Sequence, residues 1–171
     1  MTIIWFNGRS ADSLLKTLPK QSFELGCNYI ELHRPVDVVC AFDIRVVQQI
    51  TLTPGVEYYT RTDARANSTW SMVTDPALVN GGNSGILACY VARQLTQEPV
   101  YILGCDWGLS NHSRFDSVYN EGPKRKYSNN MKRAMKRIFE GTETYIVHDD
   151  TPDVPLPIIS VKHFVNELSN K

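Results

Sequence analysis

Three groups of polar residues follow directly on apolar runs in this sequence. They are the stretch Asn7-Gly8-Arg9-Ser10, the single residue Asp43, and the stretch Gly104-Cys105-Asp106. In open parallel sheets ligands bind in the crevice outside the carboxyl ends of the strands. We therefore expect the three groups to converge on one crevice, which Asp43 and Asp106 would line. The alternative is that each aspartate caps a helix or a turn.

A second polar group opens a helix at Asn83-Ser84-Gly85. The free backbone N–H groups and the dipole of a helix N-terminus favour an anion there. The turn from Asn7 to Ser10 has the same design, since Gly8 permits a close backbone approach and Arg9 adds a forked cationic donor. Neither turn matches a Walker loop or the dinucleotide fingerprint. Turns of this kind are common before helices, but two in one small chain favour a phosphate-bearing ligand such as a nucleotide.

A basic segment follows in the last third of the chain. Lys124-Arg125-Lys126 precedes a predicted helix, 127–139, whose face carries two cationic pairs at i,i+4 spacing: Lys132 with Lys136, and Arg133 with Arg137. One interpretation is an ordinary solvated helix face. The others are a clamp on a diphosphate, to which Lys126 would contribute, and a docking surface for nucleic acid or an acidic partner.

The elements that must position these residues alternate between strands and helices. Strands are predicted at 2–6, 23–30, 36–42, 56–60, 69–73, 100–103 and 144–147, and helices at 11–18, 44–50, 86–95, 127–139 and 161–168. Ser10 and Ser160 are the expected N-caps of the first and last helices, and Gly141 is expected to end the helix at 127–139. The alternation predicts one α/β domain over residues 1–171, a three-layer sandwich around a largely parallel sheet.

Composition limits the classes of protein further. The chain has 171 residues, 42% of them hydrophobic and 21% charged, with a formal net charge of zero. The composition indicates a globular domain. A net charge of zero provides no overall electrostatic attraction to nucleic acid or to a membrane. The four cysteines lie in or beside apolar segments, which predicts buried, reduced thiols. A signal peptide and an apolar run of spanning length are not found, so we predict a cytoplasmic protein.

The order of these segments resembles the family 42 glycosyltransferases (bacterial sialyltransferases) and the related Rossmann-like family that includes archaeal 6-hydroxymethylpterin diphosphokinase. Those proteins open with a strand and a Gly-Asn-Gly-Pro-Ser-type turn, which is similar to the stretch from Phe6 to Ser10. An asparagine after a short strand matches Cys27-Asn28, and a Pro-Asp-hydrophobic strand ending in Asp matches 35–43. A Ser-Gly before an Ala-rich helix and a strand ending in Gly-x-Asp match the segments 83–85 and 102–106. The resemblance covers about two thirds of the chain.

The resemblance implies a Rossmann-like fold that binds a nucleotide or nucleotide-sugar through Asn7, Gly8, Asn28, Ser84 and Gly85. The sialyltransferase comparison implies that no metal is required, whereas the diphosphokinase comparison implies that magnesium is bound. The activity it implies is a nucleotide-dependent transferase, with glycosyl transfer from a nucleotide-sugar donor as the leading hypothesis. The alternatives are a non-catalytic protein that binds or sequesters a nucleotide, and an interaction module that uses the basic helix.

Two departures from the family pattern concern the chemistry. Arg9 stands where the family has a proline, and no histidine occurs in Lys124-Arg125-Lys126-Tyr127, where the sialyltransferases carry a histidine general base. Transfer to a hydroxyl needs a group that accepts its proton. His112, in the long loop after Asp106, is the nearest substitute, and His148 at a strand end is the second.

Overall fold

The computed structural model describes residues 1–61, 69–75, 82–107, 109 and 129–169. In this part of the chain eight strands form one sheet in the order β5-β4-β3-β2-β1-β6-β7-β8, and every neighbouring pair is parallel. The strands are β1 (Thr2–Trp5), β2 (Phe23–Cys27), β3 (Val38–Cys40), β4 (Glu57–Arg61), β5 (Ser71–Val73), β6 (Val100–Leu103), β7 (Thr144–Val147) and β8 (Ile158–Ile159). The predicted α/β class with a largely parallel sheet is confirmed.

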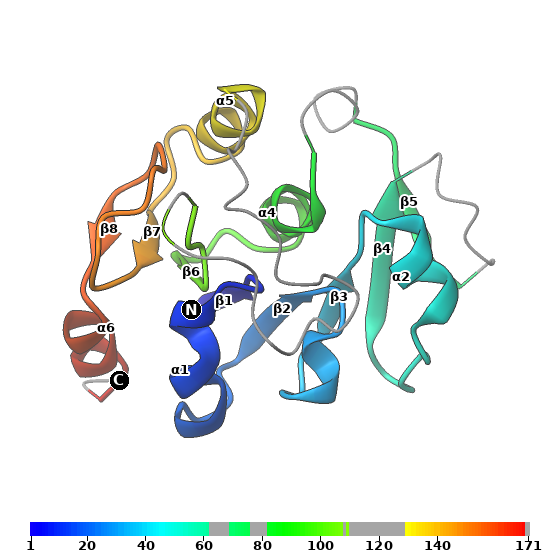
Figure 1. Cartoon of the computed structure of the whole chain (residues 1–171), viewed down its shortest axis with the longest axis horizontal. Helices are drawn as coiled ribbons and strands as arrows, with labels where there is room; N and C mark the ends of the chain where they lie inside the picture. Colours follow the sequence, from blue (N-terminus) through cyan, green and yellow to red (C-terminus); the bar gives the residue numbers. More distant parts are fainter. Residues whose placement is uncertain (62–68, 76–81, 108, 110–128, 170–171) are drawn as a thin grey trace.

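Helices cover both faces of the sheet (Figure 1). In the described part of the chain the helices are α1 (Asp12–Thr17), α2 (Ile44–Gln49), α4 (Ser84–Leu95), α5 (Asn129–Ile138) and α6 (Val161–Ser169), with short 3-10 helices η1 (Arg9–Ala11) and η2 (Ile30–Leu32). Helices α4 and α5 lie on one face, and α1, α2 and α6 pack on the other. The three layers follow from a sheet that is apolar on both faces.

Successive strand residues alternate between two hydrophobic cores. In β1, Ile4 packs under α4 and α5, while Ile3 and Trp5 pack against the helices of the opposite face. Strand β6 divides in the same way, with Ile102 in the first core and Leu103 in the second. This period of two explains why the strands have near-continuous apolar sequences.

The strand order reverses between β1 and β6. The chain moves outward from β1 through β2, β3, β4 and β5, and then returns to place β6 on the other side of β1. The loops after β1 and β6 therefore leave the same edge side by side. Such a reversal is the topological switch point at which open α/β sheets bind ligands.

Some predicted boundaries are wrong, and the backbone explains two of them. The strand predicted to Ile30 ends at Cys27 because Asn28 has a φ of 54°, outside the extended region. Ser10 does not cap a helix, since it lies inside η1 and Ala11 precedes α1. Strand β8 was not predicted. Ser160 does accept a hydrogen bond from the backbone of His163, and Gly141 has the predicted left-handed conformation, with a φ of 72°.

The four cysteines are free and buried, as predicted. Burial is the main cause that raises the pKa of the Cys40, Cys89 and Cys105 thiols well above the usual value. Among the helices of the described segments, none is long and apolar enough to cross a membrane.

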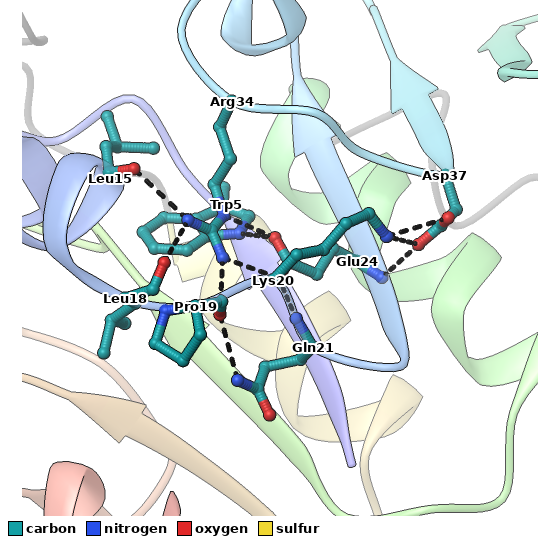
Figure 2. A network of polar contacts seen from close by, with 9 residues as sticks. All are labelled: Trp5, Leu15, Leu18, Pro19, Lys20, Gln21, Glu24, Arg34 and Asp37. Carbon is teal, nitrogen blue, oxygen red and sulfur yellow. Dashed lines mark hydrogen bonds and ion pairs between the residues drawn. The ribbon is translucent and has the colours of Figure 1, made fainter.

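A buried ion pair links Glu24 of β2 to Arg34, which follows η2, beside Trp5 of the second core (Figure 2). The side chains are 0% and 4% exposed, and the guanidinium lies 4.6 Å from the centre of the Trp5 ring. Arg34 donates to both carboxylate oxygens of Glu24, at 2.5 and 2.7 Å. Such a bidentate pair fixes geometry as well as charge.

Every donor of that guanidinium has an acceptor. The remaining N–H groups of Arg34 donate to the carbonyls of Leu15, Leu18 and Pro19, at and just beyond the end of α1. The Glu24 carboxylate also accepts from the Trp5 indole at 2.7 Å and from the backbone of Gln21 at 2.6 Å. The attraction within a buried ion pair offsets the desolvation of its charges only when further hydrogen bonds satisfy the remaining donors and acceptors, and this network meets that condition.

Candidate functional site

Asp106 is the centre of a polar cluster at the switch point between β1 and β6. Its Oδ2 accepts from the backbone N–H of Ser10 at 3.0 Å, and its Oδ1 accepts from the Ser10 hydroxyl. The Nε2 of His148 lies 3.3 Å from Oδ1, and Asp106 and His148 are each about 6% exposed. The loops after β1, β6 and β7 thus meet at one buried carboxylate.

The ring of His148 is fixed by a second hydrogen bond. Its Nδ1 accepts from the backbone N–H of Asp150 at 2.8 Å. A neutral imidazole with an accepting Nδ1 carries its proton on Nε2. That proton faces Asp106, so His148 is held as a hydrogen-bond donor to the carboxylate.

Glycines bring the two loops into contact. The N–H of Gly8 donates to the carbonyl of Gly104 at 2.9 Å. A Cβ on Gly8 would lie 2.2 Å from that carbonyl oxygen and 2.5 Å from the Cγ of Asp106. Gly104 itself has a φ of 74°. In this structure the missing side chain of Gly8 makes room for the protein's own loop after β6.

A second polar cluster lies at the ends of β2 and β3, under the N-terminus of α4. The Ser84 hydroxyl donates to the side-chain oxygen of Asn28 at 2.7 Å and accepts from the backbone N–H of Phe42 at 3.0 Å. Both Ser84 and Asn28 are buried, at 8% and 5% exposure. The cluster ties α4 to the same edge of the sheet as Asp106.

The start of α4 is capped and packed tightly. The side chain of Asn83 accepts from the backbone N–H of Ile86 at 2.9 Å, which makes it the N-cap. A Cβ on Gly85 would lie 2.6 Å from ring atoms of Phe6, so this glycine lets the helix rest directly on the residue after β1. The clusters at Asp106 and Ser84 are two strand spacings apart, or about 10 Å.

Two further predicted residues lie in the loop after β1. Asn7 and Arg9 are partly buried, and Arg9 begins η1. Asp43 is at the end of β3, where its side chain accepts from the backbone N–H of Arg45 at 2.9 Å as the N-cap of α2. That contact is the capping role that the sequence left open. Lys126 and His112 lie outside the described residues.

The predicted basic residues of α5 fall into two groups that differ in exposure. Arg133, Lys136 and Arg137 are exposed, whereas Lys132 is half-buried and forms an ion pair with Asp153. The N–H of Asp153 donates to the carbonyl of Trp107 at 2.9 Å, so Lys132 supports the loops next to Asp106. On the opposite side, Met135 and Phe139 are buried in the core that α4 shares.

Sequence reasoning considered His148 only as a substitute base, and it missed the pairing with Asp106. The available signal was the position of His148, which follows an apolar strand directly, as Asp43 does. Cys105 is next to the same carboxylate, which, after burial, further raises the pKa of its thiol. Within the described residues, no group of three or more acidic, histidine or cysteine side chains could hold a metal ion.

The fold and this site define an α/β protein with a buried polar cluster at the switch point of a parallel sheet. Neither a family model, a curated protein nor a solved structure matches the chain.

Proposed function

We propose that this chain is a cytoplasmic nucleotide-binding transferase, and that its reaction is glycosyl transfer from a nucleotide-sugar donor. The observation that supports it most is the meeting of Ser10, Asp106 and His148, from three strand ends, at the switch point. Ligands of open parallel sheets bind at this place. The glycosyl reaction itself rests on the resemblance of the motifs at 6–10, 27–28 and 83–106.

The two polar clusters suit the two ends of a nucleotide-sugar. Their separation of about 10 Å is on the scale of a diphosphate with its attached ribose. In this proposal the residues Asn7, Arg9, Asn28, Asn83, Ser84 and Gly85 hold phosphate or ribose. Asp106 lies where the transferred group meets its acceptor.

Transfer to a hydroxyl requires a group that accepts the hydroxyl proton. Asp106 already accepts a hydrogen bond from a hydroxyl, that of Ser10, so its carboxylate is oriented for such a contact. His112 remains a predicted base, and Lys126 a predicted phosphate ligand. Magnesium usually binds through one or two carboxylates together with substrate phosphates, so it is included in the test as a component of the ligand.

The test is a thermal-shift screen against cytidine, uridine and guanosine nucleotides and nucleotide-sugars, with and without magnesium. A ligand at 100 times its Kd stabilises the folded protein by about 2.7 kcal/mol, which is a visible shift in Tm. The double variant Ser84→Ala with Arg9→Ala should lower affinity for the ligand found, whereas Asp43→Asn should leave it unchanged. If no nucleotide raises Tm, the proposal is wrong.

A second candidate is a protein that binds a nucleotide without chemistry. The observation in its favour is that both ring nitrogens of His148 are engaged, so this histidine is not placed to take a proton from an acceptor. Release of sugar from the donor identified in the screen, measured with purified protein, would exclude it.

A third candidate is an interaction module that uses the exposed basic face of α5, which we define as Arg133, Lys136 and Arg137. Lys132 does not belong to this face because it pairs with Asp153. Binding to a polyanion through the face would weaken steeply with salt.

A further inference from the structure

Helix α5 concentrates positive charge in a chain whose net charge is zero. The segment 129–140 holds four basic residues and one acidic residue, Glu140, which follows the helix. One of the four, Lys132, is paired with Asp153. The other three are exposed and make up the basic face of α5. Among the residues that the structure describes, no acidic side chain forms an ion pair with this face.

The three cations are neighbours on one side of the helix. Arg133 is three residues from Lys136 and four from Arg137, and at these spacings the Cβ atoms lie about 5–6 Å apart. Like charges so placed destabilise a helix. The residues 129–138 include no acidic side chain that would offset the repulsion. A partner with closely spaced negative charges would remove it.

The chemistry of the face favours a phosphate backbone over an acidic protein. Protein interfaces centre on apolar and aromatic side chains and are depleted in lysine. Of the large apolar side chains that are exposed in the described part of the chain, none lies on α5. Two of the three cations are arginines, whose planar guanidinium groups bind phosphate oxygens in bidentate pairs.

The form of nucleic acid follows from what the face offers. Proteins hold single strands by stacking their bases on aromatic side chains. Helix α5 has no aromatic residue within its bounds. A duplex presents its phosphates on the outside, where cations alone can bind them. The face is therefore better suited to a duplex than to a single strand.

We propose that the basic face of α5 binds double-stranded nucleic acid through its phosphates, without regard to base sequence. The inference goes beyond the proposed transferase and does not rest on it, since it uses none of the residues around Asp106. Binding that releases counterions from three phosphates has a log–log dependence on salt with a slope of about −2.7, or about −0.9 for each phosphate.

The test is the fluorescence anisotropy of a labelled DNA duplex of mixed sequence, titrated with the purified protein from about 50 to about 200 mM salt. A slope of about −2.7 means that the affinity of the wild type falls about 40-fold over this range. Lys136→Gln with Arg137→Gln removes two of the three phosphate contacts. This variant should have a slope of about −0.9, and its affinity at the lowest salt should be about tenfold lower.

The matched control removes two cations from the opposite face of the sheet. Lys16→Gln with Lys162→Gln changes exposed residues of α1 and α6, which lie across the sheet from α5 (Figure 1). The net charge changes by the same amount as in the α5 variant. We expect its slope to match that of the wild type and its affinity to stay within about twofold. All four positions are exposed, and equal values of Tm would show that both variants fold.

Three outcomes would overturn the inference. The first is no binding of the duplex at about 100 μM protein and the lowest salt. The second is an equal loss of affinity in the control, since the attraction would then come from overall charge and not from this face. The third is displacement of the duplex by poly-glutamate at an equal concentration of charge, which would assign the face to acidic proteins. None of these outcomes depends on whether the protein binds a nucleotide.

Discussion

Two buried carboxylates of this protein have opposite surroundings. Glu24 faces a guanidinium with all of its donors satisfied, and the charges cancel inside the core. Asp106 is bonded to the backbone and hydroxyl of Ser10 and lies 3.3 Å from the Nε2 of His148. The first arrangement satisfies a charge and closes the structure around it. The second joins the loops that follow three strands, at the edge of the sheet where open parallel sheets bind ligands.

The largest expected effect on stability comes from breaking the network of Glu24 and Arg34. Arg34→Met removes the cation and leaves Glu24 buried without its partner, which should lower the free energy of unfolding by about 3–5 kcal/mol. Denaturant unfolding measures this loss. The double variant with Glu24→Gln should lose less than the sum of the single variants, because no unpaired charge remains. A small loss in Arg34→Met would contradict the structural role of the pair.

The stability of the protein should be less sensitive to substitutions in the cluster around Asp106. His148→Ala removes one donor from Asp106 and one acceptor from Asp150, which we expect to cost about 1–3 kcal/mol. His148→Gln can place an N–H near the position of Nε2 and should recover part of the loss. The ¹⁵N shifts of the His148 ring should show a proton on Nε2 in the wild type. A proton on Nδ1 would break the assignment of His148 as a donor.

A pH scan of the free energy of unfolding tests the buried thiols of the core. Because burial raises the pKa of Cys40, Cys89 and Cys105, the folded thiols stay protonated above pH 8.5, while those of the unfolded chain ionise. The unfolded state then binds fewer protons, so the free energy of unfolding falls as pH rises. Each thiol contributes a slope of up to about 1.4 kcal/mol per pH unit, which is reached when the unfolded thiol is fully ionised.

The matched control is Cys89→Ala, measured by denaturant unfolding under reducing conditions between pH 8.5 and 9.5. It should make the slope shallower by up to about 1.4 kcal/mol per pH unit, because one buried thiol with a raised pKa is gone. An unchanged slope would mean that the alkaline loss of stability has another origin.

The smallest expected effect concerns the basic face of α5. Lys136→Glu with Arg137→Glu should change the free energy of unfolding by less than about 0.5 kcal/mol, because both side chains are exposed. Lys132→Glu should cost more, since it breaks the ion pair with Asp153. If the double variant abolishes a salt-dependent affinity for nucleic acid, then α5 is a binding surface, and the third candidate function gains support.

Much of the fold could be predicted because the pattern of apolar residues in each strand and helix reflects which of its faces are buried. The stretches 100–103 and 144–147 are strands as predicted, since apolar runs between turns have few other solutions. Strand β8 escaped because two isoleucines after three prolines do not form a periodic pattern. Its pairing with β7 comes from the tertiary structure.

The sequence could predict where the candidate site lies, but it could not predict which of its residues contact one another. The polar residues after β1 and β6 do meet, as the parallel sheet requires. The partner of Ser10, however, was decided by three-dimensional packing between residues 96 positions apart. Spacing could not show that Asp106 would fill the turn expected to bind phosphate, nor that Asp43 would be an N-cap.

The central place of β1 also has a consequence for biosynthesis. One side of β1 pairs with β2, but the other side waits for β6, which ends at Leu103. At a synthesis rate of roughly 5–20 residues per second, that interval lasts about 5–20 s. During it β1 is an open, apolar strand edge, which is a site for association with other chains. A nascent chain stalled before residue 100 should therefore bind chaperones or aggregate, and one released after β6 should not.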